Sequence, residues 1–151
     1  MINREKYMRE ALKQAQMALK YDEVPVGAVI VKDGQIIARA GNKKERSGDA
    51  TAHAEMLSVK KAQRAIGDWR LNECEIYVTL EPCAMCAGAL INARIGKIFF
   101  GASDTRFGCC GSLMNLPADT RFNHRCETAG GVLEKECSQI LTDFFKGKRQ
   151  A

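Results

Sequence analysis

CEIYVTLEPCAMCAGALINARIGKIFFGA occupies residues 74–102, and its pattern indicates the class of fold. Its beginning, 74–80, is rich in strand formers, its middle is rich in helix formers, and 97–102 is a second apolar run typical of a strand. A strand, a helix and another strand in this order predict a crossover between parallel strands. We therefore expect an α/β protein.

The segments on either side of this stretch complete the expected architecture. Residues 24–42 hold two β-rich runs around Asp33-Gly34, a dipeptide suited to a tight antiparallel hairpin. Helices are expected where helix formers or apolar residues at helical spacing occur: 3–20, 52–66 and about 133–145. Residues 103–131 show mixed polarity and no clean period. The sum predicts a three-layer α/β/α sandwich, with a mixed central sheet of about five strands that opens with an N-terminal antiparallel hairpin.

Length, composition and charge fit a compact enzyme. The 151 residues are 46% hydrophobic, which is enough for one core, so we expect a single domain over 1–151. No stretch resembles a secretory signal or a membrane span, which predicts a cytoplasmic protein with no membrane partner. Seven cysteines are an odd number, and we expect two metal thiolates and five thiols among them. The net charge of +5 permits a polyanionic partner without requiring one.

Two short motifs, H-x-E at 53–55 and P-C-x-x-C at 82–86, carry the chemistry. His53, Cys83 and Cys86 are three ligands of the kinds that zinc prefers, whereas a purely structural zinc site has four protein ligands. The fourth position is therefore expected to be left for water. Glu55 is the expected proton-transfer group beside the metal, with a pKa that burial raises toward neutrality.

The helix starts explain how these side chains reach one site. Pro82 suits the first position of a helix, so we expect that helix to begin at its cysteines, where its N–H groups and dipole favour thiolates. His53 and Glu55 are two residues apart and would point to opposite sides of a regular helix, so the other helix must begin at about residue 52 or 53. Two helix N-termini would then meet at one metal ion, at the ends of neighbouring strands.

These motifs and their surroundings resemble the cytidine-deaminase-like zinc hydrolases, whose signature is H-x-E with P-C-x-x-C. The match is close with the bacterial tRNA-specific adenosine deaminases, through VPVGAVIV, TLEPCAMCAGALINARI, FGA and the closing DFF, and it covers almost the whole chain. The resemblance implies hydrolytic conversion of adenosine to inosine at the wobble position of a tRNA anticodon, with tRNA-Arg as the expected substrate. It also implies a homodimer with one zinc ion per chain and no nucleotide cofactor.

The resemblance further implies residue roles. His53, Cys83 and Cys86 match the zinc ligands of the family, and Glu55 matches its proton shuttle. Asn42 matches a residue that hydrogen-bonds the flipped base, Val26 and Pro82 match the pocket wall, and Asp104 matches a contact to the nucleotide backbone and ribose. The C-terminal helix that approaches the anticodon loop in the family would contain Phe144, Phe145 and Arg149. For the two phenylalanines, a place in the core is an open alternative. The family commonly has proline where Ala50 stands, so we expect a slightly less rigid loop before His53.

Alternatives remain open on the sequence alone. A deaminase of a free base or nucleoside, such as cytosine, cytidine or guanine, would share both zinc motifs, although the basic DFFKGKR end favours tRNA. A zinc-stabilised RNA-binding module would have a fourth protein ligand and no use for Glu55. His124 lies in sequence near Cys109, Cys110 and Cys126 but without C-x-x-C spacing, and its role is left open. Trp69 is expected as a buried cap.

Overall fold

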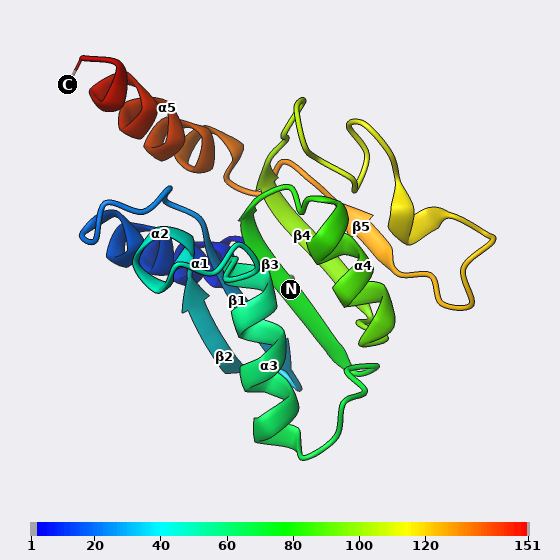
Figure 1. The fold of residues 1–151 in the computed structure, drawn as a ribbon. Coiled ribbons are helices and arrows are strands. Elements are labelled where there is room, and N and C mark those ends of the chain that lie inside the picture. The colour runs from blue at the N-terminus through cyan, green and yellow to red at the C-terminus, as the bar shows by residue number, and fades with distance from the viewer. Residues whose placement is uncertain (1–2, 151) are drawn as a thin grey trace.

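Five strands form one mixed sheet with helices on both faces in the computed structural model, which describes residues 3–150 (Figure 1). The strands are β1 (Gly27–Lys32), β2 (Gln35–Gly41), β3 (Cys74–Leu80), β4 (Lys97–Ala102) and β5 (Glu127–Ala129). Their order in the sheet is β2-β1-β3-β4-β5. β1 is antiparallel to both β2 and β3, whereas β3 with β4 and β4 with β5 are parallel. The predicted hairpin, crossover and mixed sheet are therefore confirmed.

The helices divide between the two faces of this sheet. They are α1 (Arg4–Leu19), α2 (Lys44–Ser47), α3 (Ala54–Ile66), α4 (Ala84–Asn92) and α5 (Glu134–Gln150), with a 3-10 turn at Leu116–Ala118. In Figure 1, α3 and α4 lie in front of the sheet and α1 lies behind it. Ile30 and Ile76 pack in the core cluster of α3 and α4, while their neighbours Val29 and Tyr77 pack in the cluster of α1. This alternation along the strands produces the expected α/β/α layers.

Several elements differ from those that the sequence predicts. β5 and the 3-10 turn lie within the aperiodic stretch 103–131, and each spans only three residues, too few to show a period. The four-residue α2 was not predicted for the same reason. α5 continues to Gln150, beyond the expected end near 145. The sequence did not predict these last residues as helical because they are exposed and lack apolar residues at helical spacing.

All seven cysteines are free thiols, with no disulfide among residues 3–150. Cys83 is half-buried and the other six are buried. Over the same residues, no helix combines the length and the apolar character that crossing a membrane requires.

Gly27 allows α1 to lie directly against β1. A Cβ at this position would come 2.0 Å from the carbonyl oxygen of Ala11 and 2.5 Å from the backbone nitrogen of Ala15. We expect Gly27→Ala to lower the free energy of unfolding by about 3 kcal/mol, because helix backbone cannot move aside as a side chain can. Chemical denaturation measures this loss.

Gly88 in α4 provides the matched control for that substitution. A Cβ there would meet nothing within 4 Å, and alanine favours a helix over glycine by about 1 kcal/mol. Gly88→Ala should therefore be at least as stable as the wild type. Equal midpoints for the two variants would contradict this account of how α1 packs on the sheet.

Candidate active site

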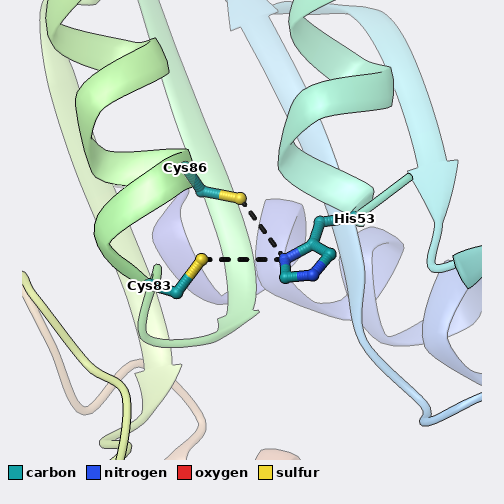
Figure 2. A group of neighbouring side chains, drawn as sticks. All are labelled: His53, Cys83 and Cys86. Atoms are coloured by element: carbon teal, nitrogen blue, oxygen red, sulfur yellow. Dashed lines mark hydrogen bonds between the residues drawn. The ribbon is translucent and has the colours of Figure 1, made fainter. Parts of the chain in front are cut away.

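The two sequence motifs meet where α3 and α4 begin. His53 is the residue that caps the start of α3, Cys83 occupies the same position in α4, and both have extended backbone conformations. Cys86 lies in the first turn of α4 and is fully buried. Figure 2 shows the imidazole of His53 facing both sulfur atoms, with its Nδ1 atom 3.8 Å from Cys83 Sγ and 3.5 Å from Cys86 Sγ. The structure thus brings the three predicted ligands together.

The helix starts differ slightly from expectation. α4 begins at Ala84, so Pro82 precedes the cap and is not the first helical residue. The extended conformation of Cys83 moves the helix start forward, while the carbonyl oxygen of Pro82 accepts the N–H of Cys109 at 2.9 Å. The loop before His53 is braced despite the absence of proline, because the Asp49 carboxylate accepts both the N–H and the hydroxyl of Thr51.

The three ligand atoms fit a tetrahedral zinc ion. Zinc bonds of about 2.3 Å to sulfur and about 2.05 Å to nitrogen, at tetrahedral angles, separate the two ligand atoms by about 3.6 Å. The observed separations are 3.5 and 3.8 Å. Of the side chains in residues 3–150, His53, Cys83 and Cys86 form the one group of three or more that could hold a metal ion. The group offers three protein ligands, which is the pattern of a catalytic site.

The protonation of the two cysteines is linked. A hydrogen bond from the thiol of Cys86, together with the contact to His53, lowers the pKa of Cys83 to about 4. The same contact between the sulfurs, reinforced by burial, raises the pKa of Cys86. The hydrogen bond with Cys83 also raises the pKa of His53. A metal ion that binds here would displace the protons that remain on the cysteines, because thiols bind metal as thiolates.

Glu55 lies in the first turn of α3, two residues after His53, and its side chain borders the same pocket. It is only 4% exposed, and this burial raises the pKa of Glu55 to about 7. A carboxyl group with a pKa near neutrality can accept a proton and return it. The position and the burial suit proton transfer beside the ligands.

A pocket of about 900 Å³ opens beside His53, Glu55 and Cys83, at the end of the sheet where β3 and β4 finish. Among the predicted substrate contacts, its lining includes Val26, Asn42, Asp104, Phe145 and Arg149. Pro82 and Phe144 do not line it. Pro82 is buried, and Phe144 is half-buried with its ring edge-on to that of Phe145. Successive helical residues point in different directions, so both phenylalanines cannot face one pocket.

The rim of this pocket is basic. Lys44, Arg106, Lys148 and Arg149 all line it, although Lys148 also forms an ion pair with Asp22. Asn42 is oriented by the backbone: its Nδ2 donates to the carbonyl oxygen of Val24, and its Oδ1 accepts the N–H of Lys44. An amide keeps one further N–H and one further lone pair after these two bonds. These can contact a ligand in the pocket.

Glu81, a buried residue of the pocket lining, was not among the site residues predicted from the sequence. Burial acts to raise the pKa of Glu81, but hydrogen bonds from Ser112, Asp104 and Cys110 outweigh it and lower the pKa. The only sequence signal was an acidic residue between an apolar strand and Pro82. Such a position is also typical of a solvated strand end.

His124 has a structural place. Its Nε2 atom lies 2.8 Å from the carbonyl oxygen of Ile95, which fastens the loop before β5 to the segment before β4. Within the described part of the chain, it belongs to no group that could hold a metal ion. Trp69 is not the buried cap that the sequence predicted: it is 47% exposed, with the guanidinium of Arg70 4.6 Å from its ring centre.

A five-stranded mixed sheet between helices, with a His-Cys-Cys group and a buried carboxylate at two helix starts, defines a deaminase of the cytidine-deaminase-like class. A family model described as MafB19-like deaminase matches residues 2–149. The chain is also 51% identical, over 146 residues, to the tRNA-specific adenosine deaminase of Bacillus subtilis (strain 168), covering 97% of this chain and 91% of that one. The corresponding protein of Aquifex aeolicus (strain VF5) is 45% identical over 148 residues, covering 98% and 97%. The chain belongs to this family of tRNA-specific adenosine deaminases.

Solved structures of two kinds of deaminase resemble this chain. One from a study of A-to-I editing by tRNA:A34 deaminases at the wobble position is 41% identical, with a TM-score of 0.87 over 90% of this chain and 99% of that chain. A guanine deaminase from Bacillus subtilis is 40% identical, with a TM-score of 0.65 over 69% of this chain and 67% of that one. The second structure bears on the choice of substrate.

Proposed function

We propose that this protein is a zinc-dependent hydrolase that converts adenosine to inosine at the wobble position of a tRNA anticodon. The observation that carries the proposal is the buried Glu55 beside a group of three protein ligands in an open pocket. A structural zinc site would have four protein ligands, whereas this group offers three. The burial of Glu55 raises the pKa of its carboxyl group to about 7, where it can take up and return a proton. The relatives named tRNA-specific adenosine deaminase support the substrate.

The reaction assigns a distinct task to each group. His53, Cys83 and Cys86 would hold the zinc ion. Zinc in such a site supplies a Lewis acid that activates water for attack on the ring carbon bearing the amine. Glu55 accepts one proton from the attacking water and passes it to a ring nitrogen. It then takes the remaining proton of the added hydroxyl group and gives it to the leaving amine, so that ammonia departs and a carbonyl group remains on the ring. A pKa raised to about 7 allows Glu55 to act in both directions.

The remaining pocket residues would bind the nucleotide. We propose that Asn42 contacts the base through its free N–H and lone pair, against a wall that includes Val26, and that Asp104 contacts the ribose and backbone. Phe145 and Arg149 would meet the anticodon loop. For Pro82 we propose support of the pocket wall next to Cys83, and for Phe144 packing against Phe145.

The buried position of Glu55 requires the target base to leave its stack. A base inside a stacked loop cannot reach a carboxylate that is 4% exposed, whereas a flipped base can enter a pocket. Sequence-specific RNA recognition commonly uses unstacked loop bases in this way. The basic rim would then hold the phosphates on either side of the flipped nucleotide.

We further propose tRNA-Arg as the substrate, one zinc ion per chain, no nucleotide cofactor, a cytoplasmic location and a homodimer. The family resemblance supports these points. For the dimer, Leu113 and Met114 offer additional support, since they are 57% and 60% exposed and a second copy could bury them.

Incubating the purified protein with total bacterial tRNA, and scoring adenosine-to-inosine conversion at each anticodon, tests the proposed function. We expect inosine at the wobble position of tRNA-Arg and no conversion elsewhere in the pool.

A second candidate is a deaminase of a free base, which the 40% identity to a guanine deaminase structure favours. Consumption of free guanine or cytidine, with tRNA left unchanged in the same assay, would establish this second function in place of the first.

Salt dependence separates the two candidates independently of turnover. Four basic side chains line the pocket, namely Lys44, Arg106, Lys148 and Arg149. If each meets one phosphate, affinity for a single-stranded loop should fall about 50-fold between about 50 mM and about 200 mM salt. Fluorescence anisotropy with an anticodon stem-loop measures the slope. An affinity that does not change with salt would contradict the proposed phosphate contacts. It is the behaviour expected of a free-base enzyme.

A further inference from the structure

Three carboxylates are buried among the described residues 3–150: two of them line the pocket, and the third bonds the helix that begins with Lys44 of the pocket lining. Glu23, Glu55 and Glu81 are 0%, 4% and 2% exposed. Glu55 takes part in the proposed reaction, whereas Glu23 and Glu81 have no task there. Burying a carboxylate costs free energy unless hydrogen bonds compensate, so the partners of these two groups identify what they do.

Glu81 is surrounded by the loop that follows β4. Its Oε1 accepts the N–H of Asp104 at 3.0 Å and the hydroxyl of Ser112, and its Oε2 accepts the N–H groups of Cys110 and Ser112 at 3.0 Å each. The loop closes tightly over the carboxylate, because a Cβ on Gly108 would come 2.4 Å from Glu81 Cδ. This one side chain therefore fixes both ends of the loop that contributes Asp104, Thr105, Arg106 and Phe107 to the pocket.

Glu23 does the same for the part of the wall that contains Asn42 and Lys44. Its Oε1 accepts the N–H of Glu45 and its Oε2 accepts the N–H of Arg46, both at 2.9 Å. These two N–H groups belong to the first turn of α2, where backbone donors lack partners within the helix. α2 begins two residues after Asn42, and Lys44 at its start also lines the pocket. Glu23 thus fixes the segment that carries both side chains.

We infer that Glu23 and Glu81 are positioning residues, each of which holds one wall of the pocket in the arrangement that receives the anticodon-loop nucleotides. Glu23 acts through Asn42 and Lys44, and Glu81 acts through Asp104 and its neighbours. Walls that are ordered before binding spare the complex the entropy cost of ordering them afterwards. The inference rests on the proposed function, since RNA is the ligand that the walls would meet.

Glu23→Gln and Glu81→Gln test the inference, because an amide of the same size turns an NH₂ group toward N–H donors. Hydrogen exchange should accelerate about tenfold or more at Asp104, Cys110 and Ser112 in Glu81→Gln, and at Glu45 and Arg46 in Glu23→Gln. Each variant should raise KM for an anticodon stem-loop about tenfold, with kcat within about threefold of the wild type. Zinc content should not change.

Glu10→Gln is the matched control, since Glu10 forms surface ion pairs with Lys13 and Arg39 and is not part of the pocket lining. It removes the same charge and should change neither exchange nor KM. If Glu81→Gln does not fold, Ser112→Ala removes only the hydroxyl bond to Glu81 and should raise KM in the same direction. Glu23→Asp serves the same purpose for the other wall, since its shorter side chain cannot reach both N–H groups.

Three results would overturn the inference: faster exchange without a change in KM, a fall in kcat with KM unchanged, or unchanged exchange in both glutamine variants. The last result would show that these carboxylates do not hold the walls. A wild-type protein that fails to edit tRNA would refute the proposed function instead, and the exchange data would still report on the walls.

Discussion

Glu55→Ala should lower inosine formation by about a thousandfold, which is the range that a positioned proton-transfer group contributes. In the proposed mechanism this carboxylate accepts the proton of the attacking water, and it borders the pocket beside His53 and Cys83. Zinc content should remain at one per chain, because Glu55 is not one of the three ligands. Glu55→Gln should lose as much, since an amide keeps the size but cannot accept the proton.

Glu134→Ala is the control for this loss. Glu134 is also an acidic residue in the first turn of a helix, but it is exposed and does not line the pocket. It should keep wild-type activity. A Glu55→Ala protein that retains more than about a tenth of wild-type turnover would remove the proposed mechanism, because general acid-base catalysis accounts for far more.

Cys86→Ala should abolish both metal binding and activity. Cys86 is one of the three ligands, and its Sγ lies 3.5 Å from His53 Nδ1. Without it, only two protein ligands would remain. A metal ion whose free concentration is a thousand times its dissociation constant stabilises a fold by about 4 kcal/mol. The free energy of unfolding should therefore fall by about that amount in Cys86→Ala. Metal analysis and chemical denaturation measure the two effects.

Cys137→Ala is the matched control, since Cys137 is equally buried but packs with α1 on the other face of the sheet. It should lose some packing energy but keep its zinc and its activity. A chelator should reproduce the Cys86→Ala phenotype in the wild type, and added zinc should restore the wild type only. Full activity of the chelated protein would contradict a metal-dependent reaction.

Much of the fold could be predicted because the deciding signals are local. The strand formers of 74–80, the turn dipeptide Asp33-Gly34 and the helical spacing around Ala11 are each signals within one short segment. β5 could not be predicted because three residues show no period, and its place depends on pairing with β4. The end of α5 was missed because polar, exposed residues leave no mark of a helix.

The candidate site divides in the same way. The ligand set follows from residue chemistry and spacing, and the structure brings His53, Cys83 and Cys86 within 4.8 Å of one another. Whether a residue lines the pocket depends on the direction in which its side chain points, and the sequence does not show this direction. Phe145 lines the pocket, whereas the adjacent Phe144 does not. Glu23 and Glu81 were missed because a buried glutamate and a solvated one look alike in a sequence. The N–H groups that bond these two carboxylates lie 22 to 31 residues away along the chain.

Glu55 and the three ligands are proposed to remove the amine of a tRNA adenosine by hydrolysis. The most direct measurement is mass spectrometry of the wobble nucleoside after zinc-loaded protein has acted on tRNA-Arg in water enriched in heavy oxygen. We predict inosine that carries one heavy oxygen atom, with one ammonia released for each, and unchanged adenosine with Glu55→Ala. Unmodified adenosine with the wild-type protein, or inosine without heavy oxygen, would contradict the account.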